Sequence, residues 1–238
     1  MWNKRLRLLV GEQKLEKLAN SVVTVVGVGG VGSFVAESLA RSNIGKLILI
    51  DYDDIDITNL NRQVHATIDT VGKKKVYVMQ DRIKSINKKC EVIAHDEFIS
   101  EENIAKLIPE NVDYIVDAID VVASKLALIE YAQKKNIKII SSLGMGNRLD
   151  PTMIKLVTLD KTSNDPLARV IRQQARKRGL NLKLPVVYSC ETPNVEIVEI
   201  NEDGETMKQK HTIASAIFVP ASAGLIIGSK VLKDIMEE

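Results

Sequence analysis

The chain has few of the residues that mark secreted or zinc-binding proteins. It contains only two cysteines, Cys90 and Cys190, among 238 residues. Two cysteines cannot form a disulfide framework, and they are too few for the paired Cys-x-x-Cys motifs of a structural zinc site. No charged-then-apolar signal peptide opens the sequence. We therefore expect a protein of the reducing cytoplasm that carries no zinc.

Excess charge and long apolar runs are also lacking. Lysine and arginine total 33 against 31 acidic residues, so any affinity for nucleic acid must be local. The longest apolar stretch, 213–227, is interrupted by Pro220 and Gly224. It is shorter than the roughly 20 residues that a membrane span needs. We interpret it as a buried C-terminal helix, and membrane association through it is the alternative.

Short apolar runs of strand length alternate with segments of helical periodicity, which predicts an α/β fold: a doubly wound, Rossmann-like, mainly parallel sheet. The expected strands are 22–26, 46–50, 92–95, 114–116 and 137–140, and the expected helices are about 32–42, 72–87 and 165–179.

The last third of the sequence is less regular. We expect strands at 153–159, 186–189 and 195–200 and an acidic turn at 201–204. The chain is therefore expected to be a single domain, 1–238. Its nucleotide-binding core covers about 1–150, and an extension of about 151–238 holds a basic helix and the apolar C-terminal helix.

A glycine-rich turn links the first expected strand to the first expected helix. Its glycines are Gly27, Gly29, Gly30 and Gly32, and Asp51 ends the next strand 19 residues beyond Gly32. Such a turn lets a phosphate approach the helix N-terminus, while the carboxylate can accept ribose hydroxyls. The pattern predicts a nucleotide site. It fits NAD as well as ATP, and a merely tight strand-to-helix connection is the structural alternative.

The residues after Asp51 favour ATP. The segment 51–56 is rich in carboxylates, and 59–63 reads Asn-Leu-Asn-Arg-Gln. A nicotinamide pocket gains little from such a cluster. Adenylation does gain, because it must hold a triphosphate, bind Mg²⁺ and stabilise charge on the α-phosphate and departing pyrophosphate.

Together these motifs resemble the ubiquitin-activating-enzyme-like adenylating superfamily, which includes the molybdopterin- and thiamine-pathway adenylyltransferases. The resemblance is carried by the glycine turn, Asp51, 59–63, Gly72-Lys-Lys-Lys75 and Asp117-Ala-Ile-Asp120.

The resemblance implies a homodimer that uses ATP and Mg²⁺, with Arg5 of one subunit reaching the phosphates bound by its partner; Arg7 is the second choice. Arg62, Lys75 and Asp120 would act with Arg5 in catalysis, and Asp120 would also bind the metal. The implied nucleotide-binding set is Gly27, Gly29, Gly30, Gly32, Asp51, Asp53, Asn59, Arg62, Gln63, Lys75 and Asp120.

Several of these residues also have ordinary structural explanations. Arg62 or Lys75 could be a solvated helix charge, and Asn59 could close a turn. Asp117 and Asp120 could cap the following helix.

Nearly the whole chain is similar to the tRNA threonylcarbamoyladenosine dehydratases. The supporting stretches are 11–13, 31–33, 53–56, 58–65, 117–120 and 163–167. This resemblance implies that the threonine carboxylate of a modified adenosine beside the tRNA anticodon is adenylated. A nitrogen or oxygen of the same substituent then closes a ring, with net loss of water and release of AMP and pyrophosphate.

A basic segment gives separate support for an RNA substrate. Its candidate contacts are Arg169, Arg172, Arg176, Lys177 and Arg178, and no acidic residue occurs between Leu167 and Leu184. Arg169, Arg172 and Arg176 are spaced to share one helical face, which suits phosphate binding. A solvated basic helix explains the same pattern.

Three further residues have open roles. Cys190 invites comparison with relatives that form a thioester, although cyclisation needs no cysteine and a small buried residue is the simpler interpretation. Cys90 has less to recommend it. His65 either lines the acceptor site or caps local structure.

Three other functions compete. An adenylyltransferase acting on the C-terminus of a ubiquitin-like sulfur carrier would use the same ATP residues, but the missing zinc motifs and the basic helix count against it. An NAD-dependent oxidoreductase leaves Arg62, Lys75 and Asp120 without roles. A non-catalytic scaffold has no need of these residues. A sulfur-transfer or redox protein partner is left open.

Overall fold

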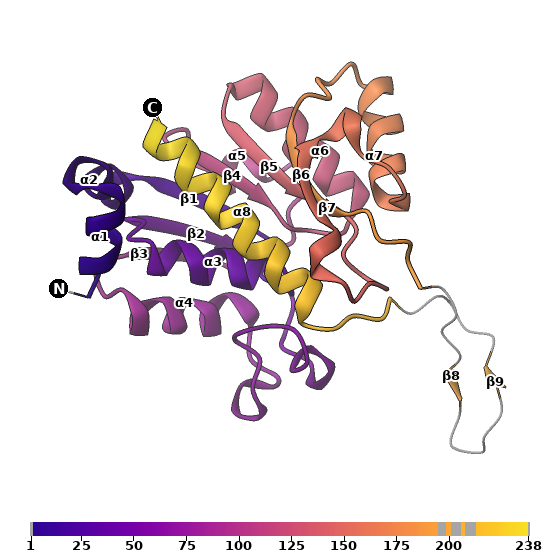
Figure 1. Cartoon of the computed structure of the whole chain (residues 1–238), viewed down its shortest axis with the longest axis horizontal. Coiled ribbons are helices and arrows are strands. Elements are labelled where there is room, and N and C mark those ends of the chain that lie inside the picture. Colours follow the sequence, from indigo (N-terminus) through magenta and orange to yellow (C-terminus); the bar gives the residue numbers. More distant parts are fainter. Residues whose placement is uncertain (1, 195–198, 201–205, 208–212, 238) are drawn as a thin grey trace.

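The computed structural model describes residues 2–194, 199–200, 206–207 and 213–237. It is built on a seven-stranded sheet with the order β3-β2-β1-β4-β5-β7-β6 (Figure 1). The strands are β1 (Val22–Val26), β2 (Lys46–Ile50), β3 (Glu91–His95), β4 (Tyr114–Asp117), β5 (Lys138–Ser142), β6 (Ile154–Thr158) and β7 (Pro185–Ser189). Every pairing is parallel except that of the edge strand β6 with β7.

The helices of the described residues are α1 (Lys4–Val10), α2 (Glu12–Asn20), α3 (Gly32–Arg41), α4 (Lys75–Ile86), α5 (Ile104–Leu107), α6 (Val122–Lys135), α7 (Pro166–Lys177) and α8 (Phe218–Glu237). Of these, α3, α4 and α8 pack on one face of the sheet, and α5, α6 and α7 pack on the other. Short 3₁₀ turns lie at η1 (Ile57–Asn59), η2 (Ile68–Thr70), η3 (Pro151–Met153) and η4 (Leu159–Lys161). A small antiparallel pair joins β8 (Glu199–Ile200) to β9 (Thr206–Met207).

The alternation of side chains along each strand divides the core into two layers. Val23 and Val25 of β1 pack with α3, α4 and α8, whereas Val26 packs on the opposite face with α5, α6 and α7. Successive strand residues point to opposite faces, so a strand covered on both sides must be apolar throughout. This explains why β1 and β2 read as continuous apolar runs.

The predicted fold class is confirmed, and the predicted strands and helices agree with the structure to within a few residues. The predicted C-terminal helix is wrong at its start: α8 begins at Phe218, and Ile213 and Ile217 precede it as exposed residues. Residues 195–198 of the predicted strand and the predicted turn at 201–204 lie outside the described residues. In the described part of the chain, no helix is long and apolar enough to cross a membrane.

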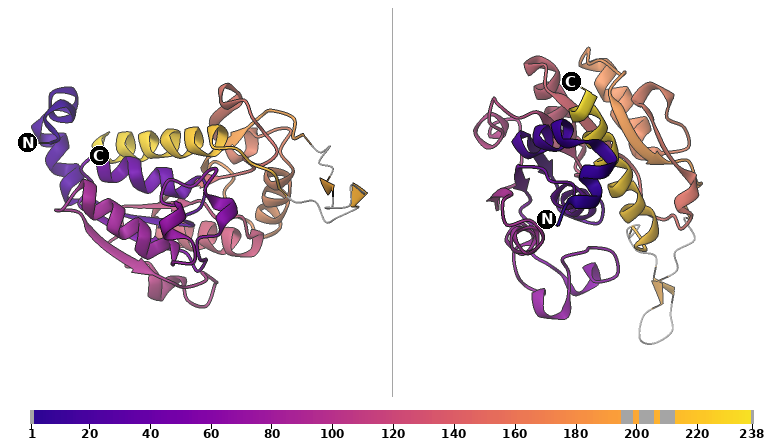
Figure 2. Two further views of the ribbon diagram at one scale, coloured as in Figure 1. Left: turned by 90° about the horizontal axis from the view of Figure 1, so that it is seen from below. Right: turned by 60° about the vertical axis from the view of Figure 1, so that its left-hand side comes forward.

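Helix α8 lies directly against α3, as Figures 1 and 2 show. The close approach depends on glycine. A Cβ added to Gly224 would lie 2.6 Å from the carbonyl oxygen of Val31 and 2.7 Å from Cβ of Phe34. A Cβ on Gly228 would lie 2.1 Å from Oγ of Ser38. The C-terminal helix therefore fixes the start of α3, which follows the glycine turn.

Replacing Gly224 with valine should destabilise the protein by about 2 kcal/mol, because the new side chain forces α8 away from α3. Ser229→Val, at an exposed position of the same helix, is the matched control. Urea unfolding measures both. Equal stability of the two variants would contradict the close-packing account.

Candidate functional site

The glycine turn lies at the carboxyl end of β1, between the ends of β2 and β4. Gly27 has φ +84°, and its N–H donates to the carbonyl of Ile50 at 2.8 Å. A Cβ on Gly27 would lie 2.7 Å from the carbonyl oxygen of Ala118, and a Cβ on Gly32 only 1.7 Å from that of Gly27. Both glycines are therefore required by the backbone itself, in a conformation or at a distance that a side chain forbids.

Gly29 and Gly30 have a different environment. The nearest atom to a Cβ on Gly29 is Nε2 of Gln63, at 3.9 Å. A Cβ on Gly30 would meet Pro220 at 3.3 Å and Cγ of Arg62 at 3.6 Å. The backbone at Gly29 is thus open, as close approach of a phosphate requires, and Gly29 and Gly30 lie beside Gln63 and Arg62 respectively.

Asp51 joins the end of β2 to this turn. One carboxylate oxygen accepts the N–H of Val28 at 2.6 Å, and the other accepts the N–H of Asp53 at 2.9 Å. Burial raises the pKa of Asp51, partly offset by Lys75 and these hydrogen bonds. Each carboxylate oxygen has a second lone pair, so Asp51 can hold the turn and still accept a ribose hydroxyl.

Lys75 is almost fully buried and is paired with a partner that the sequence did not indicate. Its Nζ lies 2.6 Å from Oδ2 of Asp53, whose side chain is half exposed. The sequence predicted that both residues contact the nucleotide. In this structure they contact each other, so a bound triphosphate would compete with Asp53 for the lysine.

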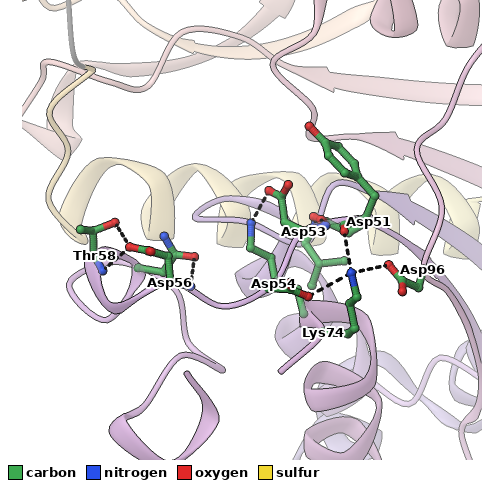
Figure 3. Close-up of polar contacts among 11 residues, drawn as sticks. Asp51, Asp53, Asp54, Asp56, Thr58, Lys74 and Asp96 are labelled. Carbon is green, nitrogen blue, oxygen red and sulfur yellow. Dashed lines mark hydrogen bonds and ion pairs between the residues drawn. The ribbon is translucent and has the colours of Figure 1, made fainter. Parts of the chain in front are cut away.

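Residues 56–72 form a loop, and Lys74 joins the two ends of this loop (Figure 3). Its Nζ lies 3.0 Å from Asp54 and 3.3 Å from Asp96, and it donates to the carbonyl of Tyr52 at 3.2 Å. The hydrogen bond with Asp54 is the main reason that the pKa of Lys74 is raised. Backbone hydrogen bonds from the N–H of Ile55 to the carbonyl of Lys73 and from the N–H of Lys75 to the carbonyl of Asp53 join the same two ends. These contacts hold the ends of the loop, and Lys75 with them, at the carboxyl edge of the sheet.

Within the 56–72 loop, η1 sets the positions of Asn59 and Arg62. The carboxylate of Asp56 caps η1 by accepting the N–H and hydroxyl of Thr58, and these bonds lower its pKa. Oδ1 of Asn59 accepts the N–H of Asp56 at 3.3 Å, so Asn59 does close a turn. Its contact with phosphate stays a prediction.

Arg62 is held at one end of its guanidinium. Its Nη1 donates to the carbonyl of Thr58 at 2.9 Å and to Oδ1 of Asn61 at 3.0 Å. Asn61 in turn donates to the carbonyl of Ser215, ahead of α8. Gln63 is buried, and its Oε1 has no hydrogen-bond partner among the described residues. An unpaired buried acceptor beside Gly29 fits a site that a polar ligand completes.

Asp117 and Asp120 have opposite environments. Asp117 is fully buried and forms an ion pair with Lys125, at 2.8 Å. Burial raises the pKa of Asp117, and Lys125 opposes this shift. Asp120 is exposed and, after Asp53 and burial, helps to raise the pKa of Tyr52. Neither aspartate caps α6, because its N-cap residue is Val121 and no side chain caps it.

Arg5 lies at the other end of the molecule. It lines a hollow together with Trp2, with Arg41 at the end of α3 and with Ile86 at the end of α4. Because α3 begins just after the glycine turn and its ten residues extend about 15 Å, Arg5 is far from the turn of its own chain. Arg5 therefore cannot reach a phosphate bound at the glycine turn of its own chain.

The basic residues on and after α7 divide into two groups. Arg172 donates to the carbonyl of Thr162 at 2.9 Å and to its hydroxyl, and Arg178 lies 3.3 Å from Glu130. The other predicted contacts, Arg169, Arg176 and Lys177, are exposed. The contact of this basic segment with RNA stays a prediction.

His65 does not cap local structure. It is 2% exposed, and neither ring nitrogen has a hydrogen-bond partner among the described residues. Burial, aided by Lys75 and Arg82, lowers its pKa to about 4. Cys90 is buried, which raises the pKa of its thiol to about 11 and keeps it unreactive. Cys190 is half-buried, with its N–H bound to the carbonyl of Met153.

Comparison with known proteins places this geometry in a family. The model of the ThiF family matches residues 3–236. The chain belongs to the ThiF family. It is 43% identical to the tRNA threonylcarbamoyladenosine dehydratase of Bacillus subtilis, over 98% of this chain and 94% of that protein.

Two crystal structures of the Escherichia coli tRNA N6-threonylcarbamoyladenosine dehydratase share the fold. The complex with AMP has a TM-score of 0.88, and the complex with ATP 0.87; both are 36% identical and cover 99% of this chain and 95% of theirs. The chain is thus a ThiF-family member of the dehydratase type. The predicted superfamily is confirmed, and the oxidoreductase and scaffold alternatives gain no support.

Lys74, Asn61 and Lys125 support the site through contacts, and they were not among the predicted site residues. Lys125 had a detectable signal, because it is the only charged residue in the otherwise largely apolar segment 121–129. A lone charge in such a segment indicates a buried partner. Lys74 and Asn61 lie within the quoted motifs 72–75 and 59–63, but nothing in those motifs indicated which groups their side chains contact.

The burial of His65 makes stability depend on pH. Between its unfolded pKa of about 6.5 and its native pKa of about 4 the unfolded chain binds a proton that the native state excludes, so stability falls as the pH falls. His65→Phe fills the same space and cannot titrate. From pH 7 to pH 5, the wild type should lose about 2 kcal/mol more than His65→Phe. Urea unfolding at both values measures this, and equal losses would show that His65 is not the titrating group.

Proposed function

We infer that the protein is an ATP-dependent tRNA threonylcarbamoyladenosine dehydratase that converts the modified adenosine to its cyclic form. The observation that carries this inference is full-length similarity to the dehydratases, with the glycine turn, Asp51, Arg62, Lys75 and Asp120 all present at one edge of the sheet. A carboxylate is a poor electrophile. Attack of one carboxylate oxygen on the α-phosphate of ATP releases pyrophosphate and gives an acyl-adenylate, in which AMP is a good leaving group.

The described residues suit this reaction. The open backbone at Gly29 and the start of α3 can face phosphates, and Asp51 can hold the ribose. The fork of Arg62 and the point charge of Lys75 suit phosphate oxygens. Mg²⁺ commonly binds through one or two carboxylates plus substrate phosphates, and exposed Asp120 fits that need. The metal would neutralise charge on the phosphates.

Ring closure needs positioning more than further chemistry. The attacking nitrogen or oxygen belongs to the same substituent as the activated carboxyl carbon, so it is already held nearby. It displaces AMP, and the oxygen lost from the carboxyl group leaves with AMP. The net change in the nucleoside is loss of one water. No thiol is required, and we propose no catalytic role for Cys90 or Cys190.

Lys75→Ala should lower kcat/KM for ATP by about 100-fold, because it removes a buried charge next to the phosphates. Lys73→Ala, an exposed lysine two residues earlier, is the matched control and should stay near wild-type activity. AMP release with modified tRNA measures both. A similar small effect in the two variants would remove Lys75 from the proposed site.

We propose that the exposed basic residues of α7 contact the tRNA backbone. Arg169, Arg176 and Lys177 are exposed, and the structure records no ion pair for them among the described residues. Arg172 and Arg178 each use one guanidinium nitrogen, Nη1, for a contact within the chain, which leaves other N–H donors of both side chains for a phosphate.

A triple change of Arg169, Arg176 and Lys177 to glutamate should raise KM for tRNA, leave KM for ATP unchanged and lower the salt-dependence slope of tRNA binding by about 2 to 3. The control changes Lys14, Lys88 and Lys89, exposed elsewhere, to glutamate. If both triple variants change tRNA binding equally, the change is caused by net charge and not by loss of a tRNA-binding surface on α7.

We further propose that the protein acts as a homodimer in which Arg5 serves the partner's site. No residue of α1 is buried, and Leu8 and Leu9 are 77% and 82% exposed. A seven-residue helix is not stable alone in water. Figure 2 places α1 at one extremity of the molecule, so a second copy can cover it without blocking the sheet edge. A cytoplasmic location remains a prediction from the sequence.

Mixing Arg5→Ala with Lys75→Ala should restore activity that neither variant has alone. In a hybrid dimer, one site combines an intact Lys75 with the partner's intact Arg5, so equal mixing should give about a quarter of wild-type activity. AMP release before and after subunit exchange measures this. Continued inactivity in demonstrably mixed dimers would place Arg5 outside the site.

A further inference from the structure

The Asp117–Lys125 pair is removed from water on every side. Both side chains have 0% exposure, and Nζ of Lys125 is 2.8 Å from Oδ2 of Asp117 and 2.8 Å from the carbonyl oxygen of Ser142. The pair therefore connects the carboxyl ends of β4 and β5 with the first turn of α6. Two charges out of water are stabilised only by such close mutual contacts, and removing one leaves the other without compensation.

The loop that follows Asp117 is packed against the glycine turn. Oδ1 of Asp117 accepts the N–H of Ile119 at 3.3 Å, which fixes the direction of the loop as it leaves β4. The next carbonyl, of Ala118, is the atom 2.7 Å from a Cβ on Gly27, and Cβ of Ala118 is 3.3 Å from a Cβ on Gly32. A shift of this loop would therefore move against the backbone of the turn.

The same loop carries Asp120 to the surface. Asp120 follows the buried Asp117 by three residues, and Lys125 follows Asp120 by five residues on α6. Asp117 and Lys125 thus hold the loop at both ends. Neither side chain is exposed, so neither can touch the nucleotide itself.

We propose that the Asp117–Lys125 pair is a positioning device that sets Asp120 for Mg²⁺ and the glycine turn for the phosphates. The inference rests on the role of Asp120 proposed above. The pair acts through geometry, because its own charges are buried and mutually compensated. Its loss should weaken Mg²⁺ and ATP binding more than tRNA binding, since the proposed tRNA contacts lie on α7 and not on the loop that the pair holds.

The test is a double-mutant cycle on Mg²⁺ dependence. ATP binding to the full-length protein without tRNA is measured by calorimetry while the Mg²⁺ concentration is varied. Lys125→Met keeps the volume of the side chain, and Lys135→Met on the exposed part of α6 is the matched control. Lys125→Met should raise the Mg²⁺ concentration for half-maximal effect by about tenfold, as loss of a ligand's supporting partner does at other metal sites.

Coupling between the pair and Asp120 decides the outcome. If the pair acts through Asp120, Lys125→Met combined with Asp120→Asn should cost no more than Asp120→Asn alone. Multiplicative effects, or an unchanged Mg²⁺ dependence in Lys125→Met, would overturn the proposal. If Asp120→Asn itself has no effect, the proposed metal role fails and the inference fails with it.

Misfolding of Lys125→Met would not stop the test. Asp117→Asn with Lys125→Met removes both buried charges and leaves no unpaired ion. If this variant folds with the wild-type unfolding midpoint but keeps the raised Mg²⁺ requirement, positioning is supported. If it folds and binds Mg²⁺ and ATP as the wild type does, the pair is only structural.

Discussion

The close backbone approach between the glycine turn and the loop after β4 is the constraint on which the site depends. The carbonyls of Ala118 and Gly27 occupy the space that Cβ atoms on Gly27 and Gly32 would need. Because β1, β2 and β4 are adjacent and parallel, this approach brings their carboxyl ends to one edge. Asp51, the start of α3 and Asp120 meet there for that reason. Parallel sheets of this type place ligands at such a change in strand order.

Charge at this edge is balanced locally rather than by the protein as a whole. Lys74 and Lys75 pair with different carboxylates of the 51–56 segment, and Arg62 is bonded to Asn61 and Thr58. These contacts hold the cations close to where phosphates would arrive and leave some of their donors available. A phosphate ligand would exchange partners with Asp53 and not create a new charged site from solvated side chains.

Much of the sheet could be predicted from sequence because its physical signal is local. Continuous apolar runs such as 22–26 must be buried on both faces, and glycine at 27 and 32 marks the turn. The helices α1, α2, α5 and α6 were not predicted. In α6, a lysine interrupts the apolar pattern, and its partner Asp117 is apparent only in three dimensions. The exposed Ile213 and Ile217 were placed in α8 because apolar composition does not reveal where a helix starts.

Side-chain partners were harder to predict than site positions. Sequence placed Asp53 and Lys75 in one site without indicating that they pair, and it gave no sign of the hydrogen bond from Arg172 to Thr162. Arg5 could be selected only through resemblance, since its own chain keeps it distant from the glycine turn. Contacts between distant segments, and between subunits, have no local pattern to reveal them.

The most direct test is the mass of the modified nucleoside after incubation with ATP, Mg²⁺ and tRNA that carries threonylcarbamoyladenosine. Dehydratase activity predicts a nucleoside lighter by one water. It also predicts that one AMP and one pyrophosphate are released for each product nucleoside. An unchanged nucleoside mass and no tRNA-dependent cleavage of ATP, with folded protein, would contradict the account.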